Sequence, residues 1–277
     1  MDFSNTLRYV EERQNDDGGF FFARQAGYST VEDTYFAISI IKAIGENVPR
    51  QDKVINFIKS FQSDDGSFSS IQVANYIIKS LTLLGEEFYV SPRFASWLLN
   101  FQKNNFWLSA KNELSLEAFE AASSVLRATG LIKNVDKEFL LSALLSFKRP
   151  DGGFGISQST LSNTYLAVKS LRNLGQSIDG ASRDFISSCE LKGIGFTEVP
   201  RTFPPTIFDL FHGFWLANAT KYELDKKGIE DFLIGFMNIN GGFRPFPQMG
   251  ISTLEHTYYA IGSLAILENW KNAELFA

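Results

Sequence analysis

Apolar residues recur at helical spacing through 161–174, directly after the segment Asp-Gly-Gly-Phe at 151–154. Paired glycines after an aspartate favour a tight turn, because glycine reaches positive φ without a Cβ penalty. Gly175 then stands where glycine commonly ends a helix. The pattern predicts a turn followed by an amphipathic helix. Its apolar face consists of Leu161, Tyr165, Val168, Leu171 and Leu174.

The same unit occurs at other places along the chain. Asp-Gly-Gly-Phe recurs at 17–20, and close variants are found at 65–68 and 240–243. Weaker copies pass through Trp107 and Phe196. The turn aromatics are spaced roughly every 45 residues, which is typical of a repeat architecture. They are Phe20, Phe68, Trp107, Phe154, Phe196 and Phe243.

A second amphipathic helix is predicted before each turn, so that each repeat reads helix, turn, helix. The helices after the turns are richer in small and aromatic residues, which favours an inner position. We therefore expect an all-α fold without strands: an α/α toroid of six helical hairpins in two concentric rings, forming a single domain over 1–277. The predicted outer helices are 5–14, 52–62, 92–102, 136–147, 182–189 and 227–237.

Composition narrows the possible partners and compartment. The 27 phenylalanines suggest a deep core or an apolar cavity, and a net charge of −5 without a basic run argues against a nucleic-acid partner. Cys189 is the only cysteine, which excludes an internal disulfide and a cysteine-cluster metal site. The first residues do not read as a signal peptide, and no apolar run approaches the length of a membrane span. We expect a cytoplasmic protein.

A polar column marks the heads of the inner helices. Aligning the repeats places Asp33, Asn163, Asp209 and His256 at one position, and His212 lies one turn beyond Asp209. Aspartate and histidine together can bind zinc or another divalent metal, or can form an acid–base pair. The same residues also have a structural interpretation. Aspartate at a helix head caps free N–H groups, and a lone inner histidine is more often a hydrogen-bonded core residue.

The repeats also carry a resemblance to known families. The pattern Gln-x3-Gly-x-Phe at 14–20 and 62–68 resembles the Gln-Trp repeats of squalene–hopene-type terpenoid cyclases, with Phe in place of Trp. Gly-Gly-Phe followed by Thr-Tyr-(apolar)-Ala more closely resembles the β subunits of protein farnesyl- and geranylgeranyltransferases. The resemblance covers about 9–267. It implies an α/α toroid with a central apolar cavity for an isoprenoid chain, and a helical partner subunit.

The resemblance extends in part to the zinc site of those transferases. Their zinc ligands lie in motifs written roughly Asp-x-Cys-Tyr-Ser-x-Trp and His-Thr-x-Tyr. This chain reads Asp-Leu-Phe-His-Gly-Phe-Trp from Asp209 and His-Thr-Tyr-Tyr from His256, so Phe211 replaces the cysteine. The resemblance implies Asp209 and His256 as metal ligands, and His212 is a third catalytic candidate. We expect at least two of these three to come within hydrogen-bond or shared-metal distance.

Other expected residues of both families are missing. Phe203 and Thr206 stand where the transferases carry cations that hold the prenyl diphosphate, and Thr160 replaces a histidine with the same role. The Asp-x-Asp-Asp motif of the cyclases is absent. Two functions therefore remain open. One is an enzyme that transfers or cyclises an isoprenoid, with Asp209 and His256 as a metal or acid–base site. The other is a non-catalytic toroid that binds a lipid or a partner.

Either function requires an apolar cavity at the centre of the ring. The aromatic side chains of the inner helices are the candidates to line it and to bind the substrate. They are Tyr76, Phe119, Tyr165, Phe211, Trp215 and Tyr258.

Overall fold

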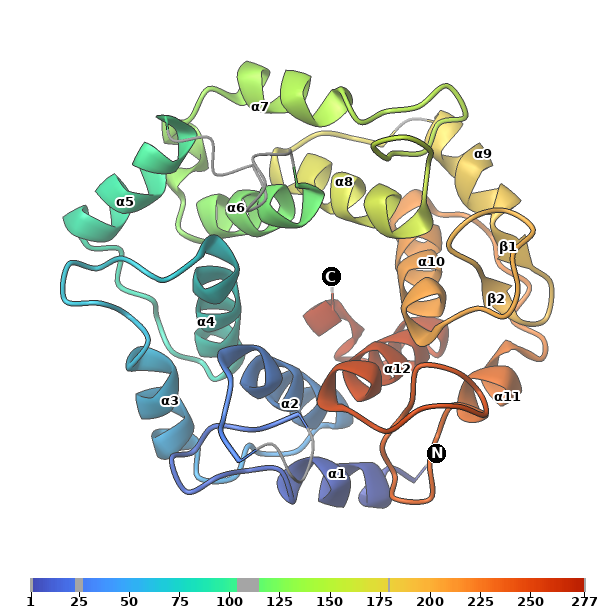
Figure 1. Ribbon diagram of the computed structural model, residues 1–277, viewed down its shortest axis with the longest axis horizontal. Helices are drawn as coiled ribbons and strands as arrows, with labels where there is room; N and C mark the ends of the chain where they lie inside the picture. The colour runs from blue at the N-terminus through green and yellow to red at the C-terminus, as the bar shows by residue number, and fades with distance from the viewer. Residues whose placement is uncertain (1, 23–26, 104–114, 179, 277) are drawn as a thin grey trace.

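The computed structural model describes residues 2–22, 27–103, 115–178 and 180–276. The helices form two concentric rings (Figure 1). Each inner helix packs against the next, and α12 packs against α2 and closes the ring. The inner helices are α2 (Val31–Ile44), α4 (Ile71–Leu83), α6 (Leu116–Ala128), α8 (Leu161–Asn173), α10 (Ile207–Thr220) and α12 (Leu254–Leu267). The toroid predicted from the repeat spacing is confirmed.

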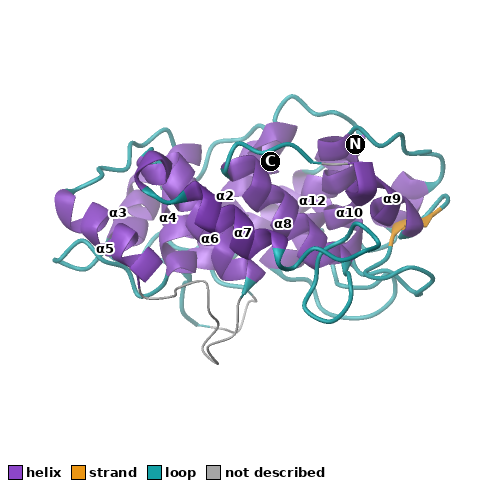
Figure 2. Cartoon of the chain, turned by 90° about the horizontal axis from the view of Figure 1, so that it is seen from above, coloured by secondary structure: helices purple, strands orange, loops and turns teal. Residues whose placement is uncertain are grey.

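The outer ring is made by the helices that precede the turns. They are α1 (Ser4–Glu11), α3 (Gln51–Lys59), α5 (Pro92–Lys103), α7 (Lys137–Leu145), α9 (Gly180–Ser188) and α11 (Ile229–Ile234). The connecting loops leave the helices on two opposite faces of the ring (Figure 2). Two short 3₁₀ helices complete the helical elements of the described residues, η1 (Leu131–Asn134) and η2 (Ala273–Phe276). In the same part of the chain, no helix has both the length and the apolar character needed to cross a bilayer.

Except for α5, which ends at Lys103, the outer helices end one to three residues earlier than the sequence predicted, because the residues that follow them pair with the turn. In the first repeat Gln14 bridges to the turn aromatic Phe20, and Gln14 Nε2 donates to the carbonyl of Gly18 at 3.1 Å. In the fifth repeat the same pairing is long enough to form two strands, β1 (Glu190–Leu191) and β2 (Gly195–Phe196). The expectation of no strand was wrong at this place. Trp107, the predicted third turn aromatic, lies outside the described residues.

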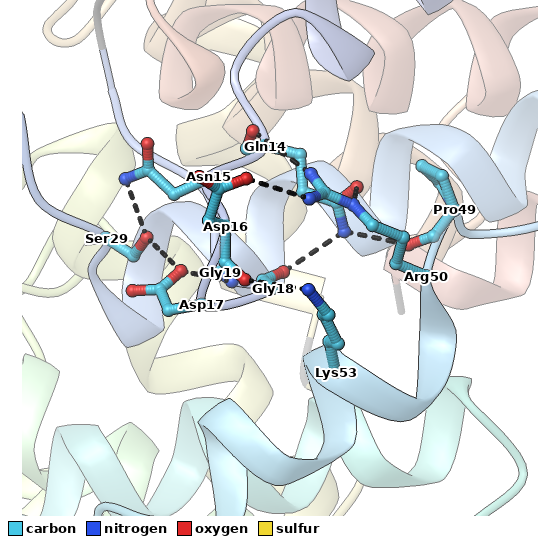
Figure 3. Close-up of polar contacts among 10 residues, drawn as sticks. All are labelled: Gln14, Asn15, Asp16, Asp17, Gly18, Gly19, Ser29, Pro49, Arg50 and Lys53. Atoms are coloured by element: carbon cyan, nitrogen blue, oxygen red, sulfur yellow. Dashed lines mark hydrogen bonds and ion pairs between the residues drawn. The ribbon is translucent and has the colours of Figure 1, made fainter.

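The first turn shows what the repeated aspartate and glycine do (Figure 3). Asp17 Oδ1 accepts hydrogen bonds from the N–H of Gly19 at 2.8 Å and from Ser29 Oγ at 2.9 Å. Gly18 has a φ of +93°, and a Cβ built there would overlap the backbone of Lys53 in α3. The turn is thus pressed against the next outer helix, which only glycine permits.

The Thr-Tyr signature at the head of three inner helices fixes the turn above it. Thr34 Oγ1 accepts the N–H of Phe20 at 3.0 Å and donates to the carbonyl of Thr30 at 2.6 Å. Thr164 and Thr257 make the same two bonds in the fourth and sixth repeats. One hydroxyl therefore joins the turn to the first turn of the inner helix. This bond explains why the two motifs occur together in the sequence.

The close approach of turn and outer helix can be tested with two glycines. Gly152 has a φ of +88°, and a Cβ there would overlap the backbone of Ala181 in α9. Gly175 has a φ of +77° with no atom within 4 Å of the added Cβ. We expect Gly175→Ala to lower the free energy of unfolding by about 1 kcal/mol, the cost of positive φ alone. Gly152→Ala should cost about 2 kcal/mol more, as measured by denaturant unfolding. Equal losses would contradict a packing role for Gly152.

Candidate functional site

The head of each inner helix is built in the same way. A serine or threonine at the N-cap accepts a hydrogen bond from the N–H of the residue three positions further on. The column that the sequence alignment singled out occupies this third position in every repeat. Its members are Asp33, Val73, Ala118, Asn163, Asp209 and His256. The register of the column was correct, and helix capping accounts for it.

Asp209 completes a capping box at the start of α10. Thr206 Oγ1 accepts the N–H of Asp209 at 3.2 Å, and Asp209 Oδ2 accepts the N–H of Thr206 at 2.8 Å. Burial raises the pKa of Asp209 to about 6, and the nearby Glu198 carboxylate contributes to this rise. Glu198 was missed by the sequence analysis, because it lies in an irregular segment outside the repeat pattern.

Each of the two histidines has a serine or threonine hydroxyl as a hydrogen-bond partner. His212 Nδ1 lies 3.1 Å from Ser162 Oγ, and its ring stacks on Tyr165 with 4.3 Å between ring centres. Burial, together with the positive charge of Lys169, lowers the pKa of His212 to about 3, so its imidazole is neutral. His256 Nδ1 lies 2.9 Å from Thr253 Oγ1, the N-cap of α12, and burial lowers the pKa of His256 as well.

These residues do not fit the zinc site implied by the resemblance. In the described part of the chain, no group of three or more His, Cys, Asp and Glu residues is arranged to hold a metal ion. No hydrogen bond joins Asp209, His212 and His256 to one another within those residues; each binds a neighbouring serine or threonine instead. Phe211, at the position of the missing cysteine, is fully buried. The metal and catalytic roles of the three residues stay predictions.

Tyrosines line a cavity at the centre of the ring. The cavity has a volume of about 180 Å³ and is bounded by residues of α2, α4, α6, α8 and α12. The hydroxyls of Tyr35 and Tyr258 lie 3.2 Å apart across the contact between α2 and α12. Tyr76 donates to Glu32 Oε1 at 2.6 Å. The lining tyrosines are Tyr35, Tyr76, Tyr165, Tyr258 and Tyr259.

Three of the six side chains predicted to line the cavity do so, namely Tyr76, Tyr165 and Tyr258. Phe119 is 1% exposed and is aligned with Thr34 of α2. The next residue in each helix, Glu120 or Tyr35, is the one that lines the cavity. Phe211 lies behind Tyr165 and Tyr258, with ring centres 5.8 and 6.0 Å away. Trp215 lines a neighbouring cavity instead. Phe119, Phe211 and Trp215 are therefore corrections to the expected lining.

Part of the central space is taken by the chain itself. The segment η2 turns into the middle of the ring, where it packs against α2 and α12 (Figure 1). Phe276 is buried there, with its ring centre 5.1 Å from that of Tyr258 and 6.3 Å from that of Phe211. Gly262 makes room for this ring, since a Cβ at Gly262 would lie 2.8 Å from Phe276.

A buried ion cluster lies beside the tyrosines, and the sequence analysis did not predict it. Glu120, at the position that is tyrosine in α2, α8 and α12, lies 3.6 Å from Lys79 Nζ and 3.5 Å from Lys169 Nζ. Burial raises the pKa of Glu120, but the two ammonium groups outweigh it and hold that pKa below its usual value. Glu120 is thus ionised inside the ring. In the alignment of the repeats, Glu120 stands at the position of Tyr35 and Tyr165, and this alignment could have located it in the cavity.

The N-terminal ends of the inner helices carry carboxyl groups instead of lysines. Burial raises the pKa of Glu255 to about 7, and the negative charges of Glu32 and Asp33 contribute to this rise. Burial likewise raises the pKa of Asp33 to about 6. Carboxyl groups therefore gather at the head end of the inner ring, whereas lysines and arginines lie further along α2, α4, α6 and α8. This distribution is unfavourable for an anionic ligand at the heads.

The family model for the prenyltransferase alpha-alpha toroid domain matches this chain over residues 2–75, 69–202 and 204–276. The chain belongs to this family. No curated protein sequence matches it significantly. The toroid assignment agrees with the repeat signature of glycine turn and Thr-Tyr helix head.

Several solved structures share the toroid fold at low identity. One is the Candida albicans protein geranylgeranyltransferase-I complexed with GGPP, with a TM-score of 0.72, 14% identity, and coverage of 99% of this chain and 93% of that one. A protein from Actinoplanes has a TM-score of 0.60, 14% identity, and coverage of 99% and 100%. A wild-type glycosidase has a TM-score of 0.57, 12% identity, and coverage of 99% of both chains. At sequence identities this low, the similarity to these structures shows the fold alone.

The raised pKa of Asp209 predicts a pH dependence of stability. The folded protein holds this proton more tightly than the unfolded chain, whose aspartates titrate near 3.8. Stability should therefore fall as the pH rises from about 4 to about 6. Asp209→Asn, which keeps an oxygen acceptor for Thr206, should remove on the order of 2 kcal/mol of this decline, measured by urea unfolding across the range. Asp184→Asn, at an exposed site, should leave it unchanged. An unaltered profile in Asp209→Asn would contradict the assignment.

Proposed function

We propose that this toroid binds an apolar molecule of the isoprenoid type in its central cavity. The observation that carries the proposal is the aromatic part of the lining: five tyrosines from four inner helices, together with Phe36 and Leu166, face a central space that amide and charged side chains also border. Aromatic walls suit the branched, unsaturated chain of an isoprenoid, because both surfaces are apolar and polarisable. Family membership supports the same class of ligand.

The size of the cavity restricts how such a molecule would bind. About 180 Å³ is below the roughly 300 Å³ at which ligand pockets usually begin. A second cavity of about 200 Å³ adjoins it, since Lys79, Glu120 and Lys169 line both. A prenyl chain would therefore extend from the tyrosines toward this second cavity, or would displace the Phe276 ring from the centre.

The proposed activity is binding, without a zinc-dependent transfer step. The three candidate ligands have other partners, and Phe211 cannot bind a metal. A helical partner subunit remains a prediction. The exposed apolar side chains Phe203, Met249 and Ile251 support it, since they lie in the loops of the last two repeats. A toroid that binds only a partner, with no small molecule in its cavity, is the outcome that a negative binding experiment would favour.

Farnesol and geranylgeraniol test the proposal directly, because they carry the apolar chain without a charged head. We expect saturable binding to the full chain by isothermal titration calorimetry, driven by burial of the chain among the tyrosines. Ala121 lines the cavity, so Ala121→Leu should weaken binding at least about tenfold.

Ala128→Leu is the matched control, since Ala128 is exposed at the end of the same helix. It should bind both alcohols as the wild type does. The proposal would be wrong if neither alcohol bound saturably, or if Ala121→Leu and the wild type bound them equally.

One observation favours a second function, the hydrolysis of a glycosidic bond. Glu255, with a pKa of about 7, is protonated in part at neutral pH and lies within the electrostatic reach of Glu32. A carboxyl group whose pKa is raised toward neutrality can act as a general acid in glycoside hydrolysis, and tyrosine rings can stack on sugars. Release of nitrophenol from a panel of aryl glycosides, lost in Glu255→Gln and kept in Glu268→Gln on the surface, would support it. The absence of any release would exclude this alternative for those substrates.

A further inference from the structure

A cavity of about 200 Å³ lies one to two helical turns beyond the tyrosines, toward the C-terminal ends of the inner helices. Lys79 of α4 and Lys169 of α8 lie at its border with the central cavity. Arg127 and Arg172 lie in the last turns of α6 and α8. Trp215 of α10 completes the wall. The cavity is thus built by four consecutive inner helices, at the end of the ring opposite to the carboxyl groups of the heads.

The charges around this cavity do not balance. Four cationic side chains face one carboxylate, Glu120, which already interacts with both lysines at 3.5 to 3.6 Å. Arg127 Nη1 donates to the backbone carbonyl of Arg172 at 3.0 Å, and the Arg172 guanidinium lies 5.2 Å from the centre of the Trp215 ring. Among the described residues, no carboxylate forms an ion pair with either arginine. An excess of three positive charges remains.

The two lysines of this group are partly buried rather than free in solvent. The side chain of Lys169 is only 12% exposed, and its Nζ donates to Tyr165 at 3.2 Å. The Lys79 side chain is 27% exposed. Within the described part of the chain, Glu120 Oε1 has no partner in hydrogen-bond geometry, so the two ammonium groups keep N–H donors for another acceptor. Partial burial strengthens the attraction of these charges for an anion, because water screens them less.

We propose that Lys79, Lys169, Arg127 and Arg172 form a binding site for a phosphate or diphosphate group. Guanidinium forks and ammonium groups together match the several oxygens of such an anion, and its two or more negative charges offset the excess. The site goes beyond the proposed isoprenoid cavity and does not depend on what fills it. Because the two cavities adjoin, the anion comes either as a free phosphate compound or as the head of an amphipathic ligand.

Inorganic pyrophosphate is the probe for the site itself. Calorimetric titration of the full chain should show saturable binding that weakens as salt increases. Arg127→Gln combined with Arg172→Gln should weaken it at least about tenfold, since both side chains are exposed and their loss leaves the core intact. The control, Lys133→Gln combined with Lys192→Gln, removes two exposed charges elsewhere and should bind like the wild type. No saturable binding at millimolar pyrophosphate, or equal binding by both double variants, would overturn the proposal.

Glu120→Gln provides a second test, in which the affinity for pyrophosphate should rise instead of fall. If the cluster binds anions, removal of its one negative charge should tighten pyrophosphate binding several-fold, although the loss of the ion pairs lowers the melting temperature. If Glu120 and its lysines only stabilise the fold, the melting temperature should fall with no gain in affinity, and the proposal fails.

Farnesyl monophosphate distinguishes the two sources of the anion. Binding much tighter than that of farnesol or pyrophosphate alone would identify the head of an amphipathic ligand, whereas affinity equal to that of pyrophosphate would identify a free phosphate compound. Ala121→Leu should weaken farnesol binding at least about tenfold and leave pyrophosphate binding unchanged. Farnesol binding therefore tests the proposed isoprenoid cavity, and pyrophosphate binding tests the proposed anion site independently of it.

Discussion

The ring depends on the close contact between each glycine turn and the outer helix that follows it. At Gly18 and Gly152 the turn backbone touches the backbone of α3 and α9, and at Gly241 the last turn meets α1 at Asn5. The same turns are tied inward by a threonine hydroxyl at the head of the next inner helix. The first, fourth and sixth repeats thus connect the inner ring to the outer ring and to the neighbouring repeat. The final contact, between Gly241 and α1, closes the circle.

This construction explains why polar residues gather at the helix heads without forming a metal centre among the described residues. Six inner helices begin at one end of the ring, and their free N–H groups require acceptors there. Asp33 and Asp209 supply carboxylates to this end, and both are buried enough to have raised pKa values. The result is an acidic rim that opposes anionic ligands. The cations that a charged ligand needs lie at the other end, around Glu120.

The fold could be predicted from the sequence because its information is local. Gly-Gly-Phe, the Thr-Tyr helix head and the helical period each describe a few neighbouring residues, and their repetition indicates a ring. The polar column at Asp209 and His256 was placed in the right register for the same reason. The outer-helix ends were missed, because Gln14 pairs with the turn rather than continuing α1. Phe119 was misplaced by one residue relative to the cavity. The cluster of Lys79, Glu120 and Lys169 joins three repeats, and nothing in each repeat alone indicates that its charges meet.

The ring has two unlike ends: carboxyl groups lie at the helix heads, tyrosines at the centre and cations beyond them. A crystal structure with farnesyl monophosphate tests the role of this arrangement most directly. We expect electron density for the prenyl chain between Tyr35, Tyr165 and Tyr258, and for the phosphate beside Lys169 and Arg172. A phosphate bound at the head end, next to Asp209 and His256, would contradict it.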